Sequence, residues 1–100
     1  TSSKRVSSLR EVPTVAEAGV PGYEVVGWYG IAAPANTPRD VINKLYSEIA
    51  NILQSPETRE KLAADGAEPV GSTPEQFAAF IQSEIDKWSR VVKSSGIHVE

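Results

Sequence analysis

The sequence contains no cysteine and no methionine, and it has a single histidine among its 100 residues. Without cysteine, disulfides and thiolate metal sites are excluded, although a reducing cytosol and a disulfide-free periplasmic protein both remain compatible with the composition. One histidine cannot build a metal site, because such a site needs several converging ligands. We therefore interpret His98 as a solvent-exposed residue near the C-terminus, and we expect neither a metal nor a cofactor.

Long apolar runs and blocks of like charge are also absent. No run approaches the roughly 18 apolar residues of a membrane-spanning helix, and the opening TSSKRVSSLR lacks the apolar stretch of a signal peptide. Ten Lys and Arg residues stand against thirteen Asp and Glu, which gives a net charge of -3. With no basic patch to neutralise phosphates, a nucleic-acid partner is not expected.

The residue arrangements of common catalytic sites are missing as well. No Gly-x-Ser-x-Gly elbow occurs, and His98 is the only histidine that could serve a triad. Glu57 and Glu60 have helical spacing, but nothing apolar nearby would shift a carboxyl pKa, so we interpret them as a solvated helix face. Residues 27–30, GWYG, lack the glycine spacing of a phosphate-binding loop. The sequence predicts a protein that is not an enzyme.

Three helices are predicted from a repeated start pattern in which a hydroxyl residue precedes proline. The pattern occurs at Thr37-Pro38, Ser55-Pro56 and Thr73-Pro74. The hydroxyl can cap a free amide of the first turn, and proline suits the first helical position because its missing N–H is not needed there. Apolar residues at helical spacing then predict helices over about 38–54, 57–65 and 74–96, the last ending at Gly96. Trp88 lies on the apolar face of the last helix and is predicted to be core.

Two segments, 23–33 and 67–71, are predicted to be strands. The first is apolar on both faces, as in a strand that helices cover on both sides. Two strands form only a marginal sheet, and such a strand needs neighbours on both edges. We therefore infer an α/β fold in which this chain is a fragment of a larger domain. Residues 10–22 are predicted to be a connector with one helical turn over 14–18.

Several short motifs follow one another along the chain. They are VPTVAEAG at 12–19, PGYE at 21–24, WYG at 28–30, AP at 33–34, TP at 37–38 and GAEPVGSTPE at 66–75. In this order they resemble the C-terminal third of the Bug-type receptors, the extracytoplasmic solute-binding proteins of tripartite tricarboxylate transporters. The opening TSSKR also resembles the end of a family strand. Glu11 and Asn36 depart from the family pattern, where Asp and Gly are usual, and Asn tolerates left-handed backbone.

The resemblance implies a fold and a division of the chain. The chain would be the C-terminal portion of one lobe of a periplasmic-binding-protein-like (type II) two-lobe fold, with about three helices and two strands. Residues 1–22 would be a connector with one short helical turn, and residues 23–100 would be the C-terminal part of the first lobe. The N-terminal remainder of a longer receptor would then supply the missing sheet partners.

The resemblance also implies a function. The receptor would be periplasmic, would bind a small organic carboxylate, and would deliver it to the membrane subunits of the transporter. The alternative is a stand-alone α/β interaction module that dimerises through the edges of its short sheet. In either case the isolated chain, with open sheet edges, is expected to self-associate.

Trp28, Tyr29 and Gly30 are the candidate ligand-binding residues, at the edge of the cleft between the lobes. On a strand, Trp28 and Tyr29 point to opposite faces, so both cannot line one pocket unless a bulge intervenes at Gly27 or Gly30. Either both aromatic residues are packing residues, or one of them borders the cleft. In the second case Gly30 would let a ligand or a neighbouring strand approach the backbone closely.

Overall fold

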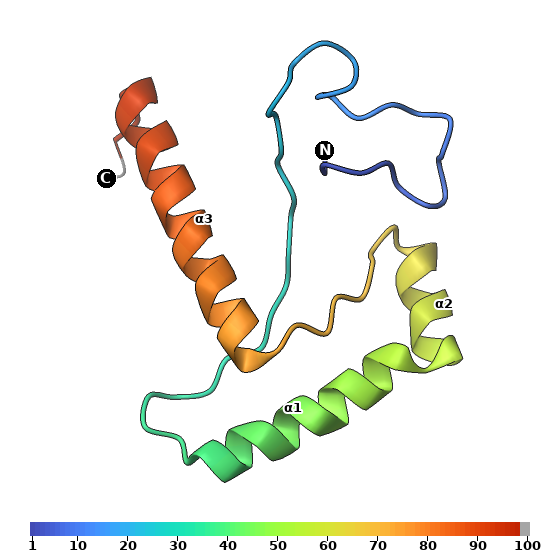
Figure 1. Ribbon diagram of the computed structural model, residues 1–100, viewed down its shortest axis with the longest axis vertical. Coiled ribbons are helices and arrows are strands. Elements are labelled where there is room, and N and C mark those ends of the chain that lie inside the picture. The colour runs from blue at the N-terminus through green and yellow to red at the C-terminus, as the bar shows by residue number, and fades with distance from the viewer. Residues whose placement is uncertain (99–100) are drawn as a thin grey trace. The chain divides into compact units, whose positions relative to one another are not determined.

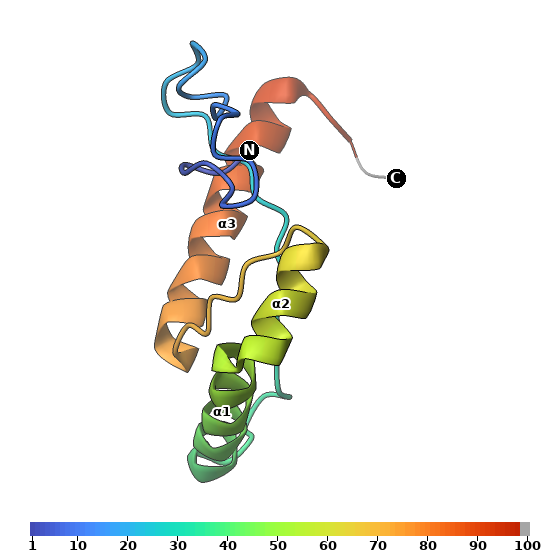
Figure 2. The same ribbon diagram turned by 90° about the vertical axis from the view of Figure 1, so that its right-hand side faces the viewer.

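The computed structural model describes residues 1–98, and within this range it contains three helices and no strand (Figure 1). Helix α1 spans Arg39–Gln54, α2 spans Pro56–Ala64 and α3 spans Pro74–Ser95. The starts and ends of α1 and α2 lie within one residue of the predicted bounds, and α3 begins where the sequence predicts. All three predicted helices are therefore confirmed, and Figure 2 shows them from a second side.

Hydroxyl residues cap α2 and α3 as the start pattern predicts. The Ser55 hydroxyl accepts a hydrogen bond from the Thr58 amide at 3.3 Å. At α3 the Thr73 hydroxyl accepts from the Gln76 amide at 3.1 Å, and the Gln76 side chain accepts from the Thr73 amide at 2.9 Å. This reciprocal pair is a capping box, which satisfies two amides that the first turn leaves free. At the other end Gly96 has a left-handed φ of 70°, as expected for a C-terminal cap.

The start of α1 differs from the other two. The Thr37 hydroxyl donates to the Pro34 carbonyl at 2.7 Å, and the Pro38 carbonyl accepts from the Ile42 amide at 3.2 Å. Thr37 therefore closes the turn before the helix, and the prediction that it caps α1 is wrong. Asn36 lies in this turn with a φ of 67°, so the turn uses the left-handed backbone that Asn tolerates.

The two predicted strands, 23–33 and 67–71, are not present in the described chain, and this part of the fold prediction is wrong. Residues 23–33 run as an extended segment (Figure 1). The Val25 amide donates to the Thr1 carbonyl at 2.9 Å, and the N-terminal ammonium of Thr1 donates to the Val25 carbonyl at 2.8 Å, but a strand requires a ladder of backbone pairs. The apolar pattern identified a segment that could pair with a neighbouring strand. Within the described residues, Thr1 is its one pairing partner.

The chain divides into two compact units. One combines residues 1–37 with 54–69, and so contains α2; the other combines 38–53 with the residues from Val70 onwards, and so contains α1 and α3. Within the second unit an ion pair between Arg39 and Glu75 joins the first turns of α1 and α3. The predicted division into 1–22 and 23–100 refers to the lobes of a complete receptor and stays a prediction.

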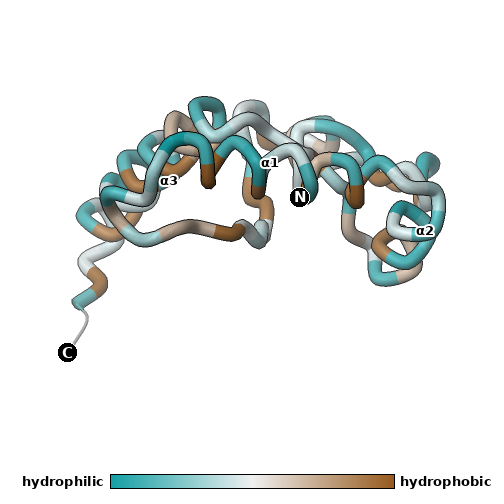
Figure 3. Tube along the Cα trace, turned by 90° about the horizontal axis from the view of Figure 1, so that it is seen from below, coloured by the Kyte–Doolittle hydropathy of each residue, from teal (hydrophilic) through white to brown (hydrophobic). Residues whose placement is uncertain are grey.

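No hydrophobic side chain is buried among residues 1–98, where Thr14 is the buried residue at 4% exposure. Hydrophobic positions recur along α1 and α3 between hydrophilic ones (Figure 3). Trp88, predicted to be core, is 40% exposed, and its indole N–H donates to Glu84 at 2.8 Å. The Lys87 ammonium lies 5.4 Å from the centre of the Trp88 ring. Trp88 is thus only partly covered, and its predicted full burial is wrong for the described chain.

Candidate functional site

The three candidate binding residues lie on the extended segment 23–33. Tyr29 is fully exposed, and Trp28 is 42% exposed. Gly27 does not adopt a positive φ, and a Cβ built on it would meet no atom within 4 Å. Because side chains alternate along an extended backbone, Trp28 and Tyr29 point away from each other. The ring of Tyr29 is uncovered in the described chain, and the role of both aromatic residues in binding stays a prediction.

A pocket of about 270 Å³ lies elsewhere, within the unit that contains α2. It is lined by Val6, Ser7, Ser8, Arg59, Ala63 and residues 66–69. None of these residues is buried, and the Arg59 and Glu68 side chains bring opposite charges to it. Trp28, Tyr29 and Gly30 do not contribute to it. Sequence reasoning did not identify this pocket, because its two sides come from segments about fifty residues apart with no shared motif.

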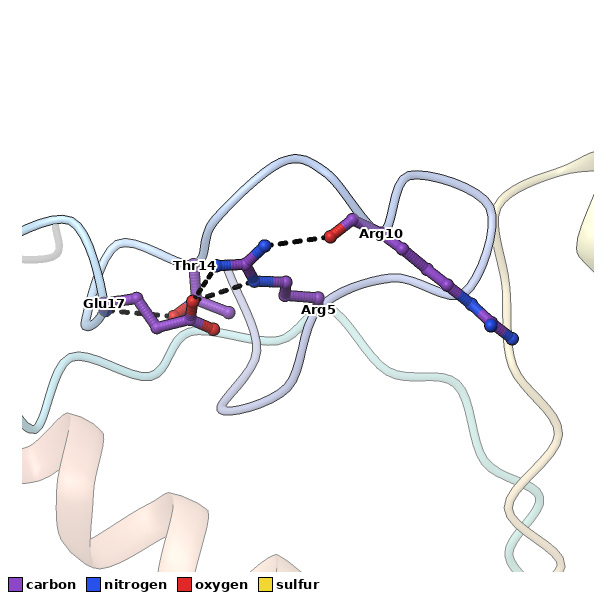
Figure 4. A network of polar contacts seen from close by, with 4 residues as sticks. All are labelled: Arg5, Arg10, Thr14 and Glu17. Carbon is purple, nitrogen blue, oxygen red and sulfur yellow. Dashed lines mark hydrogen bonds and ion pairs between the residues drawn. The ribbon is translucent and has the colours of Figure 1, made fainter.

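Polar contacts hold the connector before the extended segment in a defined loop (Figure 4). The Arg5 guanidinium donates from Nε to Glu17 Oε2 at 2.8 Å, and its Nη2 contacts the same oxygen. Its Nη1 donates to the Arg10 carbonyl at 3.0 Å. The Glu17 backbone amide in turn donates to the Thr14 hydroxyl at 3.1 Å. The Thr14 carbonyl accepts from the Ala18 amide at 2.9 Å, which closes a single turn over the residues for which a helical turn is predicted.

The electrostatics of this network keep both partners charged. The hydrogen bond from Arg5 lowers the pKa of the Glu17 carboxyl below its ordinary value, although partial desolvation opposes the shift. The same hydrogen bond raises the pKa of Arg5. The Arg5 charge is thus already paired inside the chain. We conclude that the network positions the connector and does not offer a free cation to an anionic ligand.

The described residues contain no group of three or more His, Cys, Asp or Glu side chains able to hold a metal ion. His98 is exposed. No helix in the described chain is long and apolar enough to cross a membrane. The region around Trp28 contains two aromatic side chains, which can make apolar contacts. It also contains a stretch of exposed backbone, which can accept or donate hydrogen bonds.

Comparison with protein families gives a match to the tripartite tricarboxylate transporter family receptor, TctC, over residues 1–97. The chain is 41% identical over 93 residues to a UPF0065 protein in the tcbD-tcbE intergenic region of Pseudomonas sp. strain P51, covering 92% of this chain and 28% of that protein. It is 40% identical over 95 residues to the protein BugT of Bordetella pertussis, covering 95% of this chain and 29% of BugT.

A solved structure, R. palustris Rpa4515 with adipate, matches the fold of this chain. The TM-score is 0.82 at 40% sequence identity, and the match covers 97% of this chain and 32% of Rpa4515. The chain therefore spans about a third or less of the length of these similar proteins.

Proposed function

The chain belongs to the tripartite tricarboxylate transporter receptor family, and we propose from this premise that it is the C-terminal part of a receptor for a small organic carboxylate. Receptors of this kind close around a solute by hinge motion and hold it with polar groups, without a nucleophile.

The observation that carries the proposal is the structural match to a protein solved with adipate, which extends over nearly the whole chain. Adipate is a linear dicarboxylate, so a related receptor would take a ligand of the same chemical class. Because the chain corresponds to about a third of that protein, most of the binding residues are expected to come from the N-terminal remainder of the receptor.

The location of the receptor in the cell is also inferred from the family to which the chain belongs. We assign it to the periplasm, where it would capture the solute and pass it to the membrane subunits of the transporter. It would act by binding alone, with no cofactor.

Within this chain we propose that one of the two aromatic residues, Trp28 or Tyr29, borders the ligand cleft next to Gly30. The support is the exposure of Tyr29, which leaves a large apolar surface available to a ligand or to the other lobe. In the complete receptor, a Tyr29→Ala variant should lose at least tenfold in affinity for the carboxylate with little change in thermal stability. Tyr46→Ala on α1 is the matched control. A fall in stability without a change in affinity would instead assign Tyr29 to packing.

Calorimetric titration with adipate tests the function. The complete receptor should bind adipate or a related di- or tricarboxylate, while the 100-residue chain alone should not. Dimethyl adipate, which has the same carbon chain without charge, is the matched control ligand and should not bind. Failure of the complete receptor to bind any di- or tricarboxylate would refute the proposal, and binding by the chain alone would place a complete site within these residues.

A further inference from the structure

The pocket between the connector and α2 is built entirely from residues of this chain, and both of its walls lie in the same compact unit. Its volume of about 270 Å³ is slightly below the usual range for a small-molecule site, which starts at about 300 Å³. A ligand that fits it must therefore be small. The chemistry of the two walls indicates which small ligand that is.

The first wall is a tight turn of the connector with Ser7-Ser8 at its tip. The Leu9 amide closes the turn by donating to the Val6 carbonyl at 3.0 Å. Arg5 holds the ends of the same loop together, because its Nη1 donates to the Arg10 carbonyl at 3.0 Å. Within residues 1–98 neither serine hydroxyl makes a hydrogen bond, so both can donate to a ligand.

The second wall is formed by α2 and the residues that follow it. Arg59 lines the pocket from the helix itself. The chain then leaves the helix through Gly66, whose φ of 74° lets the Ala67 amide donate to the Leu62 carbonyl at 2.9 Å. This cap brings Glu68 to the same pocket, beyond the C-terminal end of α2.

The two charged side chains of the pocket have opposite signs and are not paired. In the described part of the chain Arg59 and Glu68 form no ion pair with each other or with another residue. The planar guanidinium and the serine hydroxyls can bind a carboxylate. Glu68 can bind an ammonium group, and the dipole of α2 also favours a cation at that end of the helix. One ligand with both charges would satisfy both walls.

We propose that this pocket binds a small zwitterionic amino acid, with its carboxylate at Arg59 and its ammonium at Glu68. A simple carboxylate would leave Glu68 without a partner, and a simple amine would leave Arg59 without one. Residues 28–30 do not line the pocket, so this site is separate from the proposed carboxylate cleft. The proposal therefore does not depend on which solute the receptor carries.

NMR titrations of the complete receptor test the ligand class. The probes are glycine, β-alanine and 4-aminobutyrate, which differ in the distance between carboxylate and ammonium. Butyrate and propylamine each lack one charged group of 4-aminobutyrate and are the matched control ligands. At least one zwitterion should shift the amide signals of Ser8 and Ala67, with or without saturating adipate. The two control ligands should bind more weakly by about fivefold, because each loses one exposed ion pair.

Substitutions in the pocket test the two charged groups separately. Arg59→Gln and Glu68→Gln should each weaken binding of the zwitterion by about fivefold, the effect of one exposed ion pair. Neither side chain has a partner within the described residues, so thermal stability should not change. The matched controls are Arg90→Gln on α3 and Glu60→Gln on α2, since neither residue lines the pocket, and both should leave binding unchanged.

Three results would overturn the proposal. The first is the absence of shifts with all three zwitterions, as expected if other residues of the receptor cover the pocket. The second is displacement of the zwitterion by adipate, which would place it in the carboxylate cleft. The third is equal weakening by the pocket variants and their controls. Adipate affinity is measured on the same variants and should not change, so a receptor that binds adipate but no zwitterion would refute this site while leaving the proposed function intact.

Discussion

Arg5 directs all three of its guanidinium nitrogen atoms to partners within the connector, two to Glu17 and one to the Arg10 carbonyl. An arginine is an obvious candidate for holding a carboxylate ligand, because its planar fork matches a carboxylate. In this chain that fork is already occupied by Glu17. The residue thus shapes the loop that leads to the extended segment, and in the proposed receptor other groups would recognise the ligand carboxylate.

The ionisation of Glu17 provides a prediction at this scale. Its pKa is lowered mainly by the hydrogen bond from Arg5. A carboxyl whose pKa is lower in the folded state stabilises the fold above its unfolded pKa, and this stabilisation is lost as the pH falls through the folded pKa. An NMR titration of the Glu17 carboxyl should therefore give a midpoint below that of a Glu in an unstructured peptide. Arg5→Gln should raise this midpoint.

The control for this prediction is Arg10→Gln. Arg10 contributes its backbone carbonyl to the network, and the substitution leaves that group in place. The Glu17 midpoint should not change. If Arg10→Gln raises the midpoint as much as Arg5→Gln does, the general charge of the loop, and not the Arg5 contact, determines the ionisation of Glu17.

At the scale of elements, the capping box of α3 provides a second prediction. Thr73→Ala removes the hydroxyl that accepts from the Gln76 amide, which should cost about 1 kcal/mol of helix stability. The Gln76 amide should then exchange with solvent several times faster, as measured by NMR. Ser72→Ala, one residue earlier, removes a hydroxyl that does not cap the helix and should leave the exchange rate unchanged. Equal effects of the two substitutions would contradict the assignment of Thr73 as the cap.

The helices and the strands show which elements the sequence could predict. Helix α3 follows from local chemistry: its cap, its apolar spacing and Gly96 all lie within or next to it. The extended segment 23–33 has a strand-like pattern, but a strand exists only when another backbone pairs with it, and the described residues provide one pair at Val25. Thr37 shows the limit of local chemistry too, because α1 begins at Arg39 and the Thr37 hydroxyl donates to the Pro34 carbonyl in the preceding turn.

The candidate site was less predictable than the helices. The sequence identified Trp28 and Tyr29 from their type and position, and the structure shows where they lie without showing what they contact in a receptor. The pair formed by Arg5 and Glu17 was missed, because they are twelve positions apart along an irregular loop and no periodic pattern links them.

At the scale of the whole molecule, the exposure of the apolar residues determines how the chain should behave by itself. Val26, Tyr29 and Ile31 are all exposed on the extended segment, and no hydrophobic side chain within residues 1–98 is buried. Soluble domains normally cover such residues, and an uncovered edge beside them favours pairing with another chain. We infer that the isolated chain uses this edge for contacts between copies.

We therefore expect the isolated 100-residue chain to self-associate, with an average mass in sedimentation equilibrium that rises with concentration. Ile31→Lys should shift the association to at least tenfold higher concentration, because a charge on an edge opposes pairing. Ala35→Lys adds the same charge in the turn after Pro34 and should have little effect. A chain that stays monomeric over a hundredfold range of concentration would contradict the expectation, and equal effects of the two lysines would attribute the association to net charge instead of to this edge.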